Sequence, residues 1–288
     1  MDGKILVTGA TGNIGSQVVG LLKARQIPFR AAVHSGEKAA ALERQGIEAT
    51  VVDLNSVETI EKAMRGIDKV FSLSPFVPNL AGLGENIVKA ARRAGIKYIV
   101  RSSGLGADNP DAITLGRWHR EAEMAVEGSG IPFTIVRPIT FMQNYINFHS
   151  RTIKQQGAFY AAQGDGKVSL IDVRDVAEVM VKVLTSGGHE GKAYDITGPE
   201  AISNYEIASA LTEVAGRQIK YVDVPESAVR KGMLDTGMPE ELVNALMELV
   251  AISKAGHLSA VLPGVERLLG RKPGSFRRFA QDFKSAFV

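Results

Sequence analysis

Three glycines near the amino terminus carry the clearest chemical signal, in the segment Gly9-Ala10-Thr11-Gly12-Asn13-Ile14-Gly15. In a turn that joins a strand to a helix, the first glycine allows the tight bend and the second lets the backbone approach a diphosphate. The third lets the helix pack closely on its strand. Free N–H groups at the start of the helix attract the phosphate oxygens. We therefore predict a dinucleotide site, with a glycine turn of purely structural role as the alternative. The predicted contacts are Gly9, Thr11, Gly12, Asn13, Ile14 and Gly15.

The type of dinucleotide depends on the end of the second predicted strand. A site selective for NAD usually has Asp or Glu there, about 20 residues beyond the glycine loop, to bind the ribose hydroxyls. Here the segment reads Val33-His34-Ser35-Gly36 and contains no acid. His34 and Lys38 are placed to face a 2′-phosphate, which favours NADP(H) over NAD(H). The alternative for this pair is a solvated surface.

The third predicted strand ends in Val51-Val52-Asp53-Leu54. A side chain at this point can bond the adenine amino group, so we predict that Asp53 and Leu54 contact the cofactor. An acid that starts the following helix is the alternative for Asp53.

The remaining candidates follow the later strands, because ligands of open parallel sheets bind beyond the carboxyl ends of the strands. We expect one group beside the nicotinamide and another at the acceptor. Turn and cap chemistry is the alternative for the serines, and ordinary core packing is the alternative for the apolar residues. The nicotinamide group is Leu73, Ser74, Pro75, Ser102 and Pro138, and the acceptor group is Ser103, Phe141, Met142 and Asn144.

His119 is the best titratable candidate, because an imidazole can deliver a proton near neutral pH. A structural or surface histidine is the alternative. The five histidines show no ligand spacing and there is no cysteine, so we predict no metal site. The chain lacks the G-x-S-x-G elbow of serine hydrolases.

These residues require a scaffold of alternating strands and helices. Short apolar runs and helical patterns alternate about six times in the first half, which indicates parallel pairing with right-handed crossovers. We predict an α/β fold of Rossmann type, a doubly wound parallel sheet. The predicted strands are Ile5–Thr8, Phe29–Val33, Ala49–Val52, Val70–Leu73, Tyr98–Val100 and Phe133–Val136.

After about residue 150 helices dominate and predict a smaller, mostly helical carboxyl-terminal lobe. The predicted cofactor domain is 1–155 plus about 167–186, and the substrate lobe is 156–166 and 187–288. Short strands are expected at 159–160, 168–171 and 219–222. The predicted helices of this half are Val173–Leu184, Tyr205–Ala215, Glu226–Leu234, Pro239–Lys254, Val261–Leu269 and Phe276–Ala286.

Composition narrows the function classes. The 288 residues include 34 Lys+Arg and 31 Asp+Glu, with a net charge of +3, and no basic run is long enough to follow a nucleic-acid backbone. No apolar run is long enough to cross a membrane. We expect a cytoplasmic protein that binds neither nucleic acid nor membrane.

Several motifs in order resemble the NmrA-like branch of the atypical short-chain dehydrogenases/reductases. They are the glycine loop, Val52-Asp53-Leu54, Gly130–Pro138, Phe141–Asn144, Ile171–Ala177 and Gly191–Pro199. Within that branch the chain is most similar to the bacterial NAD(P)H:quinone oxidoreductase and triphenylmethane reductase type. The resemblance implies NADP(H) and a cleft between two lobes. The branch also contains redox-sensing regulators without catalysis.

The chain departs from ordinary members of this superfamily at one point. Those enzymes use a Tyr and, four residues later, a Lys, whereas this chain has Leu115 and His119 there. The quinone and dye reductases that the chain resembles also lack the Tyr and have a His. We expect an NAD(P)H-dependent reductase that passes hydride to an apolar aromatic acceptor such as a quinone or dye. The alternative is a non-catalytic NADP(H) sensor that acts through a protein partner. The sequence leaves open whether the chain forms a homodimer. The absent Tyr disfavours an epimerase-like enzyme.

Overall fold

The computed structural model describes residues 3–288, which divide into two compact units. The first contains the residues up to Ala112, Gly116–Pro138 and Val176–Asp195. The second contains Ile113–Leu115, Ile139–Asp175 and Ile196–Val288. The division expected from the sequence, a cofactor domain of 1–155 plus about 167–186 and a substrate lobe of 156–166 and 187–288, stays a prediction.

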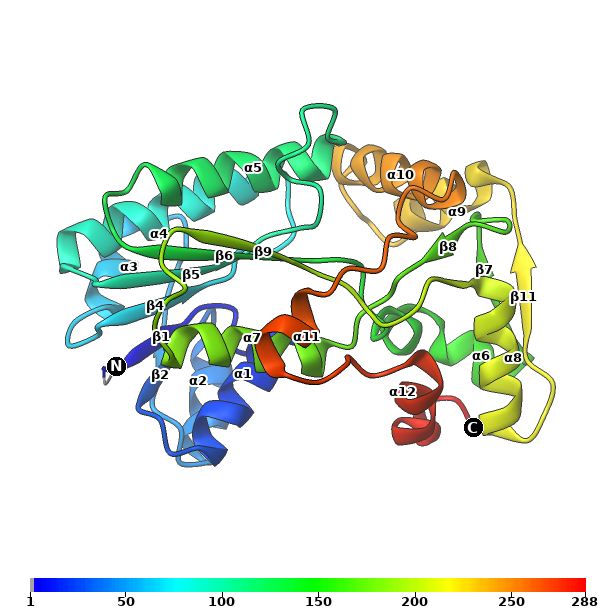
Figure 1. The fold of residues 1–288 in the computed structure, drawn as a ribbon, viewed down its shortest axis with the longest axis horizontal. Helices are drawn as coiled ribbons and strands as arrows, with labels where there is room; N and C mark the ends of the chain where they lie inside the picture. The colour runs from blue at the N-terminus through cyan, green and yellow to red at the C-terminus, as the bar shows by residue number, and fades with distance from the viewer. Residues whose placement is uncertain (1–2) are drawn as a thin grey trace. The chain divides into compact units, whose positions relative to one another are not determined.

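A seven-stranded sheet of order β3-β2-β1-β4-β5-β6-β9 forms the centre of the first unit (Figure 1). The pairs with a recorded register are parallel, for example Ile5 opposite Phe29 on one side and opposite Lys69 on the other. The predicted Rossmann-type fold is therefore confirmed. The strands are β1 Ile5–Val7, β2 Phe29–Val33, β3 Ala49–Val51, β4 Lys69–Ser72, β5 Tyr98–Ser102, β6 Phe133–Pro138 and β9 Lys192–Ile196.

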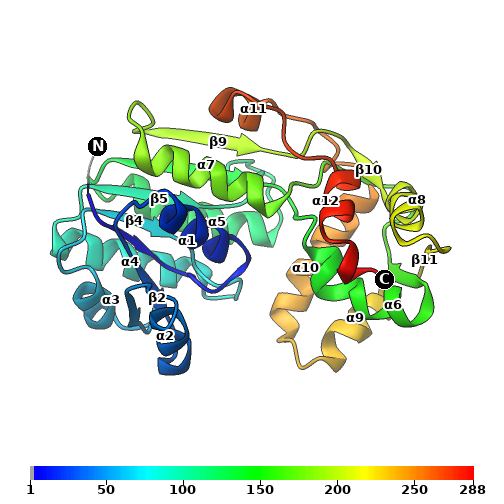
Figure 2. The same ribbon diagram turned by 90° about the horizontal axis from the view of Figure 1, so that it is seen from below.

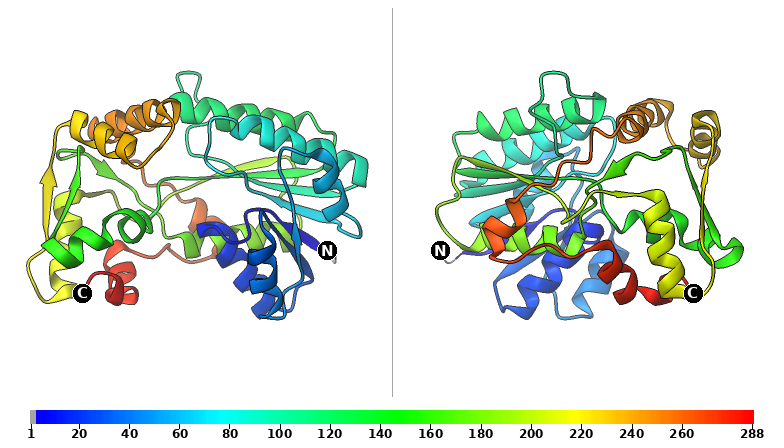
Figure 3. Two further views of the ribbon diagram at one scale, coloured as in Figure 1. Left: turned by 180° about the vertical axis from the view of Figure 1, so that it is seen from behind. Right: turned by 45° about the vertical axis from the view of Figure 1, so that its right-hand side comes forward.

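Helices cover both faces of this sheet. Helices α1, α2 and α7 lie on one face and α3, α4 and α5 on the other (Figures 1 and 3). Arg25 of α1 pairs with Glu178 of α7, consistent with their shared face. The bounds are α1 Asn13–Ala24, α2 Gly36–Glu43, α3 Val57–Ala63, α4 Leu80–Ala94, α5 Thr114–Glu127 and α7 Val173–Thr185.

The core forms because apolar residues recur at the period of each element. The residues of β1 are all buried, as expected for a strand covered on both faces. Helix α4 buries Leu83, Ile87 and Ala91 along one stripe, and it ends at Gly95, whose φ of 69° suits glycine. These contacts fix the strand ends at which the predicted ligand residues lie.

The second unit is mostly helical, as the sequence predicts. Glu213 of α8 pairs with Arg277 of α12, and the two helices lie side by side (Figures 1 and 2). Strands β7 and β11 pair in parallel and β8 and β10 pair antiparallel. Its elements are η1 Tyr145–His149, α6 Ser150–Gln156, β7 Ala158–Ala161, β8 Lys167–Val168, β10 Ile202–Ser203, α8 Asn204–Ala215, β11 Lys220–Asp223, α9 Glu226–Asp235, α10 Glu240–Lys254, α11 Gly264–Leu269, α12 Phe276–Asp282 and η2 Lys284–Ala286.

The structure corrects several expectations for this half. The strand expected at 168–171 ends at Val168, because Ser169 bonds instead to the carbonyl groups of Leu258 and Ala260. Strand β9 was not expected. The helix expected from Val261 begins at Gly264, since a residue that precedes proline avoids helical geometry.

The expected helix over 276–286 is also shorter. Helix α12 ends at Asp282, and the short 3-10 turn η2 follows it. Within residues 3–288, no helix combines the length and the apolar character that a membrane span requires.

Candidate functional site

The glycine loop has the geometry that a diphosphate site requires. Gly9 has a φ of 64° and its carbonyl accepts a bond from Gly12 N at 2.9 Å. A Cβ on Gly15 would lie 2.0 Å from the Gly9 carbonyl oxygen, so only glycine fits there. Gly9 and Gly15 thus have the turn and packing roles that their spacing predicts, while the approach of Gly12 to a diphosphate stays a prediction.

The amino end of α1 is open to a ligand. Its N-cap is Gly12, with no side-chain hydrogen bond and no acid in the first turn. The serines Ser35, Ser56 and Ser203, by contrast, cap α2, α3 and α8 with their hydroxyl groups. Thr11, Gly12 and Asn13 are exposed. An anion can therefore approach the positive end of the α1 dipole without displacing a side chain.

Thr8 joins this loop to the next strand end, a role that sequence reasoning missed. Its hydroxyl donates to the Leu73 carbonyl at 2.8 Å and accepts from Leu73 N at 2.7 Å. The Leu73 side chain contacts the Gly9 position, where an added Cβ would lie 3.0 Å from Leu73 Cδ2. Thr8 therefore holds the ends of β1 and β4 together, with Leu73 beside the glycine loop.

The end of β2 carries no acid that faces a ligand. His34 is exposed and Lys38 half-buried, and Lys38 N donates to the Ser35 cap. Glu37 lies in the first turn of α2 and is exposed. The positions that would contact a ribose or its 2′-phosphate are thus basic or neutral.

Asp53 closes β3 in a turn of its own. Its carboxylate accepts bonds from Asn55 N at 2.9 Å and from the Asn55 side chain at 3.0 Å, and these bonds lower the pKa of the exposed carboxyl. Ser56, not Asp53, caps α3. Leu54 is half-buried, and its carbonyl accepts a bond from Asn86. Asp53 is therefore an ionised side chain at the surface.

Strands β4, β5 and β6 bring a second group of predicted residues together. Ser74 is buried and accepts a bond from Arg101 at 3.0 Å, while Pro75 is exposed. Ser102 and Ser103 are buried, and the Ser103 hydroxyl makes no hydrogen bond. The Pro138 carbonyl accepts from Leu105 N.

His119 projects from α5 toward the same strand ends. A Cβ on Gly104 would lie 2.9 Å from its Cδ2, and its ring centroid is 6.2 Å from that of Phe76. Burial, with the Arg101 charge, lowers the pKa of His119 to about 3. The imidazole is therefore neutral at physiological pH, which differs from the expected pKa near neutrality, while the catalytic role of His119 stays a prediction.

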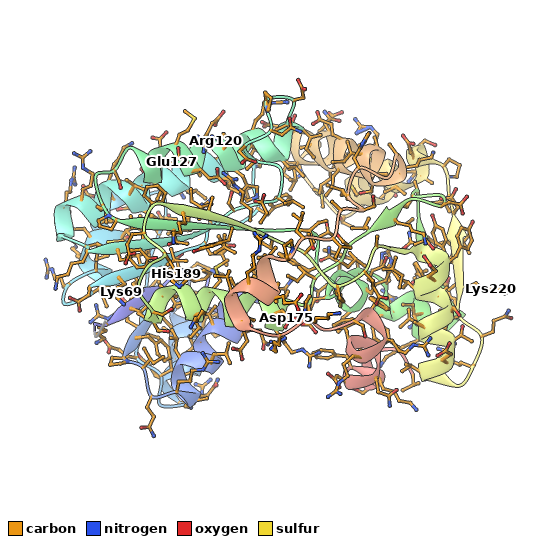
Figure 4. The ribbon with its side chains drawn as sticks, in the orientation of Figure 1. Lys69, Arg120, Glu127, Asp175, His189 and Lys220 are labelled. Carbon is orange, nitrogen blue, oxygen red and sulfur yellow. The ribbon has the colours of Figure 1, made fainter. Side chains whose placement is uncertain are left out.

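A charged network lies beside His119. Fully buried Glu123 accepts two bonds from Arg137, at 2.7 and 2.8 Å, and one from Arg120 at 2.9 Å. Arg120 also binds Glu127 on the outer side of α5 (Figure 4). Burial opposes the charge of Glu123, but the bonds from Arg137 outweigh it and its pKa lies below the ordinary value.

The predicted acceptor residues after β6 lie in the second unit. Phe141 is half-buried and forms a parallel bridge with Ile171. Met142 is 1% exposed, a core position in this unit. Asn144 is half-buried, and its N–H donates to the Phe141 carbonyl. Their role toward an acceptor stays a prediction.

Two further features of residues 3–288 bear on the site. No group of three or more histidine, aspartate or glutamate residues there is arranged to hold a metal ion. A shallow surface cavity of about 340 Å³ lies between the loop 107–112 and Arg117, Arg120 and Glu121 of α5. None of the predicted site residues lines it.

Comparison with known proteins supports this geometry. A family model described as the NmrA-like family matches residues 1–271. The chain is 41% identical to an NAD(P)H azoreductase of Xenophilus azovorans, over 98% of this chain and 99% of the azoreductase. It is 33% identical to quinone oxidoreductase 2 of Escherichia coli, over 88% and 89%. The crystal structure of Citrobacter sp. triphenylmethane reductase complexed with NADP(H) superimposes with a TM-score of 0.83 and 28% identity, covering 97% and 99%.

Proposed function

The chain belongs to the NmrA-like family, and from this premise we propose that it is an NAD(P)H-dependent reductase of apolar aromatic acceptors such as quinones or dyes. The observation that carries the proposal is the glycine loop, which leaves the amino end of α1 uncapped while tying it to the end of β4. An azoreductase and a quinone reductase among the relatives support the acceptor class.

The residues present fit a nicotinamide dinucleotide. The glycine loop would hold the diphosphate, and Asp53 and Leu54 would contact the adenine. Ser74 and Ser102, with Leu73, Pro75 and Pro138, would line the nicotinamide end, with Ser103 toward the acceptor. When bound, the reduced cofactor supplies a hydride, that is, two electrons and one proton.

The chain itself contributes alignment and exclusion of water. Leu115 stands where ordinary members of the superfamily have an acidic phenol, and His119 is neutral. His119 lies against Gly104, which follows β5, and near the ring of Phe76, and we propose that it borders the nicotinamide end of the site. A carbonyl that needs a strong acid is a poor substrate here, whereas an electron-poor aromatic acceptor is not.

We propose that NADP(H) is preferred over NAD(H) because His34 and Lys38 stand where an acid would bind the ribose. Lys38→Gln is expected to weaken NADPH binding about 10-fold, the size of one lost bond to a charged group, and to change NADH binding less than twofold. Calorimetric titration with each cofactor measures this. Lys62→Gln, on exposed α3, is the control. Equal losses for both cofactors, or tighter NADH binding by the wild type, would refute the preference.

One assay separates the reductase from a sensor. The purified protein is mixed with NADPH and a panel of quinones, and cofactor oxidation is followed by absorbance. A reductase consumes one NADPH per quinone and saturates in both. A sensor shows no turnover and markedly unequal affinity for NADP⁺ and NADPH. We also propose that the protein is cytoplasmic. That it forms a homodimer or binds a regulatory protein stays a prediction.

A further inference from the structure

Arg101 of β5 is a buried cation without a counter-ion in contact. Its side chain is among the largest fully buried ones, with 1% exposure. Nη1 donates to Ser74 Oγ at 3.0 Å and lies 3.5 Å from Ser72 Oγ, while Nε and Nη2 make no hydrogen bond. Among the ion pairs of residues 3–288, none within 4.0 Å includes Arg101. A guanidinium in this state is costly to bury, which points to a use at a functional site.

Glu123, the carboxylate that acts on Arg101 through space, is already engaged with other cations. Glu123 is held by Arg137 and Arg120, and Arg120 also pairs with Glu127. Asp108 pairs with Arg137, from which Asp195 lies 3.7 Å away.

Arg101 therefore supplies a positive charge that no contact neutralises, although Glu123 acts on it through space. Burial lowers its pKa to about 10, so the guanidinium remains charged at neutral pH.

The position of Arg101 places this charge at the nicotinamide end of the proposed site, next to Ser103, toward which the acceptor would bind. It bonds Ser74 after β4 and precedes Ser102 and Ser103 on β5. It also acts on His119, whose ring contacts the Gly104 position. In a poorly solvated region such a charge acts over several ångströms with little screening.

We propose that Arg101 makes the acceptor site selective by charge, favouring neutral or anionic aromatic acceptors over cationic ones. The inference rests on the proposed reductase function and narrows its substrate class. A neutral quinone that accepts a hydride forms one new bond to hydrogen and becomes a monoanion, which then takes a proton from water. The donor C–H bond breaks and the dihydronicotinamide is oxidised. Arg101 stabilises the negative charge that develops on the quinone.

A cationic triphenylmethane dye behaves in the opposite way. It takes the hydride at its central carbon and becomes neutral, so it develops no negative charge and needs no proton. Its positive charge is repelled by Arg101 in the bound state. The structure thus favours quinones or azo compounds over cationic dyes as acceptors of this chain.

The test uses three naphthoquinones that share one redox core and carry a neutral, a sulfonate or a quaternary ammonium group on a short alkyl chain. For the wild type we expect kcat/KM for the ammonium compound to be at least about 10-fold below that of the neutral one. Arg101→Met is expected to bring the two within about threefold, and Arg101→Lys to restore most of the difference. Arg30→Met, on β2 and bound to Glu48, is the matched control.

Binding supplies a readout that does not need turnover. Calorimetry of the NADP⁺-loaded protein with the same compounds should show the same order of Kd values. Nitrogen NMR of the histidine side chains should show a higher pKa for His119 in Arg101→Met, because Arg101 contributes to lowering it. A purely structural role would weaken all three acceptors equally.

The outcomes are distinguishable. Turnover and binding by the wild type without charge discrimination overturn the inference and leave the reductase function intact. Absence of turnover with every acceptor overturns the proposed function, while the Kd order still decides the charge selectivity. If Arg101→Met does not fold, the comparison of the three naphthoquinones with the wild type and with Arg101→Lys decides whether the site selects by charge.

Discussion

Replacing Gly12 by aspartate is expected to weaken NADPH binding by about 100-fold or more while the protein stays folded. Gly12 is the N-cap of α1, with a φ of −82° that any residue can adopt. An aspartate there caps the helix and stabilises it. The same carboxylate places a negative charge at the amino end of α1, where it repels the diphosphate and competes with it for the backbone N–H groups. Calorimetric titration with NADPH, with circular dichroism as the folding check, measures the effect.

The control for this change is Gly20→Asp. Gly20 lies on the same helix, is exposed, and has no atom within 4 Å of an added Cβ. The Gly20→Asp change introduces the same charge two helical turns away from Gly12. It should alter NADPH affinity by less than about threefold, since screening weakens charge effects over that distance. Equal losses from the two variants, or wild-type affinity in Gly12→Asp, would show that the cofactor binds elsewhere.

The second large effect concerns stability. Glu123→Gln is expected to lower the free energy of unfolding by about 3–5 kcal/mol, because it removes the charge that compensates buried Arg137. Thermal unfolding should shift down by roughly 10 °C. The matched control is Glu127→Gln on the same helix, which also binds Arg120 but is 34% exposed at its side chain. An exposed pair contributes at most about 1 kcal/mol. Equal effects of the two changes would contradict the role given to Glu123.

The Glu123 effect also depends on pH. Its pKa in the folded protein lies below the ordinary value. Its contribution is therefore fully present above the unfolded-state pKa near 4.3 and is lost as the pH falls through the folded value. The difference in stability between wild type and Glu123→Gln should be constant from pH 6 to 8 and shrink below about pH 4. A difference that grows on acidification would contradict this assignment.

The fold was largely predictable because parallel strands and their helices follow simple periods. The glycine loop, His34 and Ser74 each lie at the strand ends expected from topology alone. Strand β9 was missed because Lys192-Ala193-Tyr194-Asp195-Ile196 is mostly polar and only Ile196 is fully buried. Its place at the sheet edge explains this composition, since an edge strand needs less apolar surface.

The polar interior of the site was not predictable from patterns. Arg101 sits inside the buried strand Tyr98-Ile99-Val100-Arg101-Ser102 and Glu123 inside an amphipathic helix, and a sequence does not show which polar residues turn inward. A charged residue within an apolar strand was the one available signal. The pKa of His119 depends first on its burial and then on both neighbours, and so required the structure.

The central claim is that the turn after β1 holds the diphosphate of a nicotinamide cofactor. The most direct measurement is a crystal structure of the chain with NADP(H) bound. We expect diphosphate oxygens within hydrogen-bonding distance of backbone N–H groups between Thr11 and Ile14, and a nicotinamide ring beside Ser74 and His119. A diphosphate bound away from the first turn of α1, or no bound nucleotide at saturating concentration, would contradict it.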